Sequence, residues 1–139
     1  MCGIAGFSNF TMNYKEDAGK WYSILQQMNL LQRHRGPDDE NIYLCRHCGL
    51  SHVRLSILDL SCGKQPMTKQ TDGHRATIVY NGEIYNMPQL RNNLMAEGAF
   101  FETNCDTEVI LLGYLYHGID YLQELNGIFS FCIWDETLE

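Results

Sequence analysis

The sequence predicts a single domain of the α+β class, in which helices and strands are mixed along the chain. Residues 17–33 carry apolar side chains, from Trp21 to Leu31, at the spacing that places them on one face of a helix. Residues 128–135 instead alternate between two sets of side chains, which is typical of a strand. No linker, repeat or change of composition divides residues 1–139, and a chain of 139 residues is long enough to bury one core.

Five further strands are predicted from apolar runs and the turn residues between them, at 2–9, 41–45, 50–58, 76–80 and 83–85. A tight connection at 46–49 joins the second and third of these. Asn81-Gly82 is the strongest short turn signal in the chain and separates the last two. Residues 61–73 contain glycines and a proline and are expected to form a long polar loop.

Two further helices are predicted, at 86–97 and from 106 or 107 to 117, followed by a short helix or turn at 119–125. Asn86 and Gln89 have the spacing of a capping box, and Asp106 or Thr107 is expected to cap the second of these helices. The predicted helix ends are marked by Gly36-Pro37, Gly98 and Gly118.

Composition and charge argue against several classes of protein. Hydrophobic residues make up 45% of the chain, which argues against intrinsic disorder. A formal net charge of −7 argues against nucleic acid or an anionic membrane as the main partner. No apolar run approaches the ~18 residues needed to span a bilayer, and the N-terminus lacks the pattern of a signal peptide. We therefore expect a cytoplasmic protein whose six cysteines are reduced.

Cys2 would become the first residue on removal of Met1, which places a thiol and a free α-amine on one residue. An α-amine has an ordinary pKa of about 7.7–8.0, so at neutral pH part of it is unprotonated and able to accept the thiol proton. N-terminal nucleophile enzymes use this chemistry. For a Met-Cys start alone, an ordinary buried cysteine at the beginning of a strand is the favoured interpretation.

Arg54, Asn81, Gly82 and Asp106 each have a structural and a chemical interpretation. Arg54 lies in an otherwise apolar strand, where its planar fork would bind either a substrate carboxylate or an internal partner such as Asp59. Asn81-Gly82 would form a hairpin turn, or an oxyanion hole made of one side-chain amide and one backbone N–H. Asp106 would cap a helix or bind a substrate ammonium. Taken singly, none of these residues identifies a site.

Cys45-Arg46-His47-Cys48 is a CxxC sequence, and His52 lies close to it in the chain. Such a pair can supply zinc ligands or a redox dithiol, but structural zinc sites usually need a second ligand pair, and none is well spaced here. A hairpin turn with two incidental thiols is the favoured interpretation. The residues expected to serve only in packing are Cys62, Cys105 and Cys132.

Seven sequence blocks occur in one order along the whole chain. The blocks are Cys2-Gly3-Ile4-Ala5-Gly6, His34-Arg35-Gly36-Pro37-Asp38-Asp39, Arg54-Leu55-Ser56-Ile57, Gly63-Lys64-Gln65-Pro66-Met67, Tyr80-Asn81-Gly82-Glu83-Ile84-Tyr85-Asn86, Thr103-Asn104-Cys105-Asp106-Thr107-Glu108 and Leu125-Asn126-Gly127-Ile128-Phe129-Ser130-Phe131. Together they resemble the glutaminase domain of class II glutamine amidotransferases, of the asparagine synthetase (glutamine-hydrolysing) type. The resemblance implies the four-layer α-β-β-α sandwich of the N-terminal nucleophile hydrolases.

The resemblance also implies a role for the residues already singled out. Cys2 would be the nucleophile, with its own amine as the base, and Asn81 and Gly82 would form the oxyanion hole. Arg54 would bind the α-carboxylate of glutamine and Asp106 its α-ammonium. The residues implied to complete the glutamine site are Glu83, on the amine side, and Leu55 and Ile57, through backbone contacts. The implied reaction hydrolyses L-glutamine to glutamate and ammonia through a thioester.

Members of the resembled family carry ATP and Mg in a synthetase domain, and that domain and further sandwich strands are absent from residues 1–139. We therefore expect no cofactor and no metal in this domain, and a sandwich incomplete at its C-terminal end. A partner chain is expected to supply the synthetase domain for asparagine biosynthesis, or the chain to form a homo-oligomer. Residues 128–134 have high β propensity and no charge, which is typical of an aggregation-prone segment. Two alternatives remain open: a catalytically inactive remnant, and a metal-binding or redox module built on the CxxC sequence.

Overall fold

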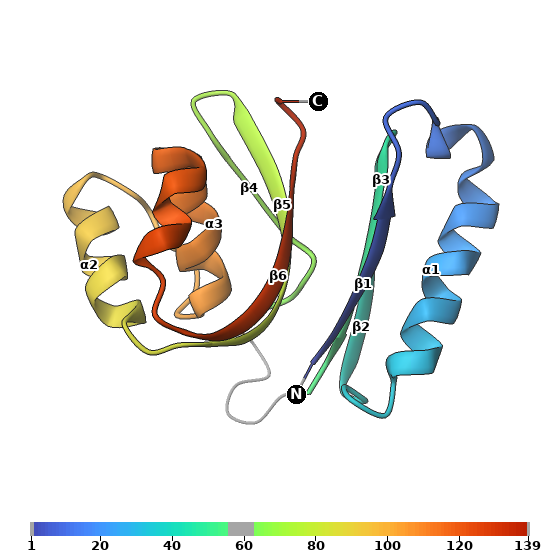
Figure 1. The fold of residues 1–139 in the computed structure, drawn as a ribbon, viewed down its shortest axis with the longest axis horizontal. Helices are drawn as coiled ribbons and strands as arrows, with labels where there is room; N and C mark the ends of the chain where they lie inside the picture. The colour runs from blue at the N-terminus through green and yellow to red at the C-terminus, as the bar shows by residue number, and fades with distance from the viewer. Residues whose placement is uncertain (1, 56–62, 139) are drawn as a thin grey trace.

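The computed structural model describes residues 2–55 and 63–138, which form four layers (Figure 1). One helix covers the first sheet, the second sheet packs against the first, and two helices cover the outer face of the second sheet. The elements are β1 (Gly3–Ser8), the 3₁₀ helix η1 (Tyr14–Asp17), α1 (Ala18–Gln32), β2 (Asp39–Leu44), β3 (Cys48–Arg54), β4 (Met67–Thr71), β5 (His74–Ile84), α2 (Met87–Ala96), α3 (Asp106–His117), the 3₁₀ helix η2 (Gly118–Glu124) and β6 (Gly127–Asp135). The predicted α-β-β-α sandwich is confirmed.

The first sheet is antiparallel and has the order β1-β3-β2. Gly3 pairs with Val53, so the N-terminus lies beside the end of β3. α1 packs on the outer face of this sheet, where the Leu25 side chain is completely buried. A Cβ on Gly49 would lie 2.7 Å from the Phe7 ring, so only glycine lets β1, β3 and α1 approach so closely here.

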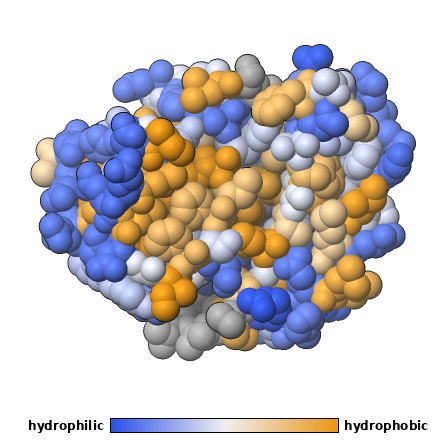
Figure 2. Space-filling model, in the orientation of Figure 1, coloured by the Kyte–Doolittle hydropathy of each residue, from blue (hydrophilic) through white to orange (hydrophobic). Residues whose placement is uncertain are grey.

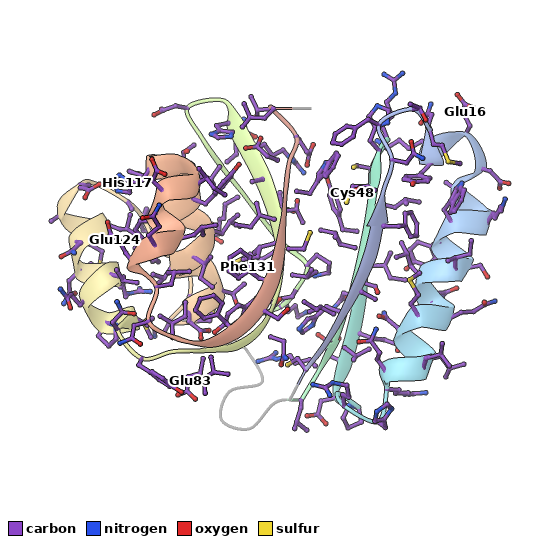
Figure 3. All side chains as sticks on the ribbon, viewed as in Figure 1. Glu16, Cys48, Glu83, His117, Glu124 and Phe131 are labelled. Carbon is purple, nitrogen blue, oxygen red and sulfur yellow. The ribbon has the colours of Figure 1, made fainter. Side chains whose placement is uncertain are left out.

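The second sheet is antiparallel and has the order β4-β5-β6, with β5 at its centre. Its outer face and α3 enclose the larger core, in which Ile78, Ile110 and Leu111 are completely buried. Phe131 points from β6 toward this helix side (Figure 3). α3 is buried over most of its length because α2, η2 and the sheet surround it.

A smaller apolar cluster joins the two sheets. Its buried members are Cys45, Cys48, Leu50, Val79 and Trp134. A cleft of about 390 Å³ opens beside it, lined by residues of β1, β3, β5 and β6. β1 and β6 are the outer strands of their sheets in the described part of the chain, and Figure 2 shows apolar side chains gathered around β6 on this face.

Two predictions about the second sheet were wrong. Asn81-Gly82 does not form a turn, because β5 runs through both residues and pairs them with β6. The hairpin turn is Asp72-Gly73, whose φ values of 49° and 83° suit a two-residue connection between β4 and β5. Residues 61–73 are therefore not one long loop, since their second half contains β4.

Predictions about the helix caps were also wrong. Asn86 precedes α2 but makes no capping hydrogen bond, because its side-chain amide donates to Glu124 O (2.9 Å) and its Oδ1 accepts from Asn126 N–H (3.0 Å). Cys105, not Asp106 or Thr107, occupies the N-cap position of α3. Among the described residues, no helix is long and apolar enough to cross a membrane.

Candidate active site

A pocket of about 620 Å³ lies at the end of the sandwich where the chain begins. It is lined by the residue before β1, by the starts of α3 and β6, by the end of β3 and by the C-terminal part of β5. Seven of the eight predicted site residues line it, namely Cys2, Arg54, Leu55, Asn81, Gly82, Glu83 and Asp106. Ile57, the eighth, lies outside the described residues, as does Asp59, the alternative partner considered for Arg54.

Strand register brings Cys2 and Arg54 to the same pocket. Because Gly3 pairs with Val53, the residue before β1 lies at the end of β3 that carries Arg54. Cys2 is half-buried; its Sγ lies 4.0 Å from the carbonyl oxygen of Leu55, and its own carbonyl accepts from Arg35 Nε (3.2 Å). The thiol and the guanidinium therefore come from two strands that the first sheet holds side by side.

Asn81 and Gly82 reach the pocket from the extended backbone of β5. They pair with Ser130 and Phe129 of β6. A Cβ on Gly82 would lie 2.4 Å from the carbonyl oxygen of Ile128, so any other residue would push the two strands apart. Strand pairing thus fixes the backbone from which the Asn81 side chain and the Gly82 N–H extend. Donors on a fixed backbone would suit an oxyanion, because the backbone need not reorganise when charge develops.

Asp106 faces the pocket from the first turn of α3. Its Oδ2 accepts from Tyr80 OH (2.6 Å) and from Ile84 N–H (3.3 Å). Burial and the Asp106 carboxylate raise the pKa of Tyr80, so the phenol stays protonated and continues to donate. Glu83 is exposed at the mouth of the same pocket (Figure 3).

Gln65 and Tyr80 support the pocket in a way that the sequence did not reveal. Gln65 is buried, its Oε1 accepts from the backbone N–H of Tyr80 (2.6 Å), and its amide donates to Thr107 Oγ1 (3.2 Å). One side chain therefore ties β5, next to Asn81, to the start of α3, next to Asp106. Both residues lie within the seven sequence blocks, but their presence in a block does not by itself indicate what either residue does.

A buried ion pair organises the segment before Asp106. Glu108 is completely buried and accepts from Lys69 Nζ (2.6 Å), from Glu102 N–H (2.9 Å) and from Thr103 N–H (2.7 Å). Burial by itself would raise the pKa of Glu108, but the hydrogen bonds from Lys69 and Thr103 hold it below its ordinary value. No role for Lys69 was predicted, because Lys69 and Glu108 are 39 residues apart in the chain.

His52 lies between the sheets beneath the pocket and is 1% exposed. Burial lowers the pKa of its imidazole to about 4, so it is neutral at pH 7, although a hydrogen bond to the backbone of Tyr80 acts in the opposite direction. Its Nε2 has no hydrogen-bond partner among the described residues, which leaves Nδ1 as the atom facing Tyr80. His52 thus connects β3 to the peptide that precedes Asn81.

The CxxC sequence lies away from this pocket. Cys48 pairs with Ser8, at the opposite end of β1 from Cys2. In the described part of the chain, no group of three or more His, Cys, Asp or Glu side chains could hold a metal ion. His47 lies between the two cysteines in the sequence. Its Nδ1 is 2.7 Å from the carbonyl oxygen of Met12, with which it forms a hydrogen bond.

The pocket can hold a molecule with charges of both signs. Arg54 ends β3 of the first sheet, Glu83 lies on β5 of the second sheet, and Asp106 begins α3, which packs on the second sheet. A guanidinium binds a carboxylate bidentately, and a carboxylate binds an ammonium. The pocket thus places a thiol, an amide side chain next to a glycine, and charged side chains of both signs around one space, a set of groups that acyl transfer from an amino acid would require.

The whole chain, residues 1–139, matches the family described as the glutamine amidotransferase domain. The glutamine-hydrolyzing asparagine synthetase 3 of Bacillus subtilis (strain 168) is 40% identical over 136 residues, which cover 98% of this chain and 22% of that protein. The putative glutamine-hydrolyzing asparagine synthetase 2 of Methanocaldococcus jannaschii is 42% identical over 154 residues, covering 98% of this chain and 28% of that protein. The chain thus spans less than a third of the length of either relative.

Two solved structures share the fold. Glutamine phosphoribosylpyrophosphate amidotransferase from B. subtilis matches 65% of this chain and 22% of its own, with a TM-score of 0.53 and 23% sequence identity. A structure described as the allosteric regulatory enzyme of purine biosynthesis matches 67% of this chain and 22% of its own, with a TM-score of 0.55 and 25% identity. Both likenesses support the fold of the two-sheet sandwich.

Proposed function

Because the chain belongs to the glutamine amidotransferase domain family, we propose that it hydrolyses glutamine, with Cys2 as the nucleophile. The observation that carries this proposal is the convergence in one pocket of Cys2, Arg54, Asn81-Gly82 and Asp106, which lie on separate segments of the chain. After removal of Met1, the α-amine of Cys2 would accept the thiol proton. The thiolate would then attack the side-chain amide carbon of glutamine.

The remaining residues fit the later steps. Asn81 and the backbone N–H of Gly82 would stabilise the oxygen of the tetrahedral intermediate as charge develops on it. The protonated amine would give its proton to the departing ammonia, and water would then hydrolyse the thioester to glutamate. Arg54 and Asp106, with Glu83 and Leu55 beside them, would hold the amino-acid end of glutamine.

The test combines turnover with chemical labelling. Purified chain lacking Met1 should release ammonia from glutamine, and a glutamine analogue with an electrophilic side chain should label Cys2 alone, as read by peptide mapping. Cys2→Ser should lose both properties, whereas Cys132→Ser, which changes an exposed cysteine outside the pocket, should keep both. Labelling mainly at Cys45 or Cys48 would contradict the proposal.

The acceptor of the ammonia is a separate proposal, supported by the names of the relatives. We propose that the released ammonia serves asparagine synthesis by a synthetase domain, within a longer protein or on a partner chain. Glutamine labelled with ¹⁵N in its side-chain amide should transfer the label to asparagine when this chain is combined with a synthetase domain that lacks its own glutaminase. Ammonia release without label in asparagine would exclude this acceptor but not the glutaminase.

A further inference from the structure

We propose that Cys45 and Cys48 form a reversible intramolecular disulfide, which makes the turn between β2 and β3 a redox modification site remote from the pocket. Both thiols belong to the buried cluster that joins the two sheets. They serve no step of the proposed glutaminase reaction, so this inference stands whether or not Cys2 is the nucleophile.

The turn already holds Cys45 and Cys48 at a separation that suits a disulfide bond. They flank its two central residues, and Cys45 N–H donates to Cys48 O (2.8 Å). Residues at the two ends of such a turn have Cα atoms less than about 7 Å apart, and disulfides span about 4.4–6.8 Å. The Cys48 thiol also donates a hydrogen bond to Cys45, so the sulfur atoms face each other.

Neighbouring contacts fix this turn in place. The carbonyl of Arg46 accepts from Tyr14 N–H (2.8 Å), and that of His47 accepts from Asn9 N–H (3.0 Å). The His47 ring also lies against the carbonyl of Met12, as described above. All three contacts come from residues 9–14, so this one segment holds the turn in the conformation that already brings Cys45 and Cys48 opposite each other.

Cys45 has the properties of the attacking thiol. The pKa of Cys45 is lowered to about 6, and the largest cause is the hydrogen bond from Cys48. Backbone N–H groups of His47 and Cys48 also lower this pKa, whereas burial acts to raise it. Cys45 therefore has more thiolate character at neutral pH than an ordinary cysteine, and the thiolate is the reactive form. Cys48 lines the apolar cleft between the sheets and points into the space between them (Figure 3).

A small peroxide is the oxidant that this buried pair can accept. The Cys45 thiolate attacks one oxygen of hydrogen peroxide, so that an S–O bond forms, the O–O bond breaks and hydroxide leaves. Cys48 then attacks the Cys45 sulfur; the S–S bond forms, the S–O bond breaks, and the leaving hydroxide takes the Cys48 proton to become water. The hydroxide of the first step takes the proton that the Cys45 thiol had released, so two thiols are oxidised and one peroxide is reduced to two waters; an added dithiol reverses the change.

The test treats the whole chain with hydrogen peroxide, blocks remaining thiols with N-ethylmaleimide and maps the peptides. We expect Cys45 and Cys48 to be joined, with a loss of two hydrogens that dithiothreitol restores. Cys132→Ser, the control at an exposed cysteine, should form the bond at an unchanged rate. This measurement needs no substitution in the turn, so it does not depend on variants that fold poorly.

Two variants separate the roles of the thiols. In Cys48→Ser, the sulfenic acid on Cys45 has no partner and should be trapped by dimedone. In Cys45→Ser, Cys48 should be oxidised on the order of tenfold more slowly than Cys45 is in the native chain. The inference is overturned if both thiols are still alkylated when Cys132 is oxidised, if Cys48 bonds to Cys132 instead, or if purified chain retains a stoichiometric zinc ion that protects both thiols.

Discussion

The two halves of the sandwich position their site residues by different means. In the first half, Cys2 and Arg54 stand at the ends of neighbouring strands, and backbone pairing of β1 with β3 sets their places. In the second half, strand pairing places Asn81 and Gly82, but buried polar side chains also tie β5 to α3 and secure Asp106.

This difference predicts which half of the sandwich should tolerate substitution of the residues around its site residues. A site residue that depends on strand register is protected by many backbone hydrogen bonds, so no single supporting side chain decides its position. A site residue that depends on a buried polar network is sensitive to each member, since a lost partner leaves a buried charge or donor unsatisfied. The second half should therefore carry the substitutions with the largest indirect effects.

The largest expected effect is that of Lys69→Met, which leaves the Glu108 carboxylate buried without its cation. Breaking such a pair costs about 3–5 kcal/mol, so the free energy of unfolding in urea should fall by about that amount. The control is Arg75→Met on the same sheet, whose ion pair with Glu136 is partly exposed, at 48% and 29% of the two side chains, and should be worth less than about 1 kcal/mol. If both variants lose the same free energy of unfolding, the buried Lys69–Glu108 pair contributes no more to stability than the partly exposed pair.

Asn81→Ala tests a residue of the second half of the sandwich that is proposed to act on the reaction itself. Loss of one oxyanion donor should lower kcat by about 10²–10³-fold, with little change in KM, because the donor acts mainly in the transition state. Steady-state glutaminase kinetics measure both constants, and circular dichroism checks the fold. Full turnover in a folded variant would remove Asn81 from the proposed mechanism.

His52→Asn tests the connection between the two halves. The folded pKa of about 4 lies below the ordinary value of 6.5, so the unfolded chain binds more protons between these values. Stability should therefore fall as pH drops from about 6.5 to 4, by about 3 kcal/mol in total from this group. Asn keeps a donor near the Nδ1 position but cannot titrate, so unfolding of the variant between pH 7 and 4 should depend less on pH. A variant as pH-dependent as the native chain would refute the assignment.

Arg54→Lys and Asp106→Asn each change one residue that is proposed to bind glutamine, the first in one half of the sandwich and the second in the other. Each should raise KM for glutamine by about 10–100-fold, the equivalent of a lost charged hydrogen bond of about 1.5–3 kcal/mol. Lysine keeps the charge of Arg54 but loses the bidentate fork. Unchanged KM in both variants would mean that these residues serve the structure alone.

The sequence predicted the layers, most elements and the pocket residues, because periodicity and motif order are local or collinear signals. It misplaced the hairpin at Asn81-Gly82, since a turn-type dipeptide also suits a strand that another backbone approaches closely. It gave no role to Gln65 or Lys69, because each acts through a partner distant in the chain and known only once the sheet is assembled. The sequence motifs therefore pointed to residues that line the pocket, Asp106 included, but not to the buried polar side chains that hold them in place.

The central position of β5 has a consequence for how the molecule opens. Residues 76–78 of β5 have a paired neighbour on both sides, and residues 76–80 are all buried, so the amides of this segment should be among the last to exchange with solvent. β1 is an outer strand of its sheet in the described part of the chain, so its amides should exchange through smaller, local openings. The strand that follows the thiol would then open more often than the buried segment of β5 that leads into Asn81 and Gly82. In the proposed mechanism, the nucleophile would therefore sit on the more mobile of the two strands, and the proposed oxyanion donors would extend from the more protected one.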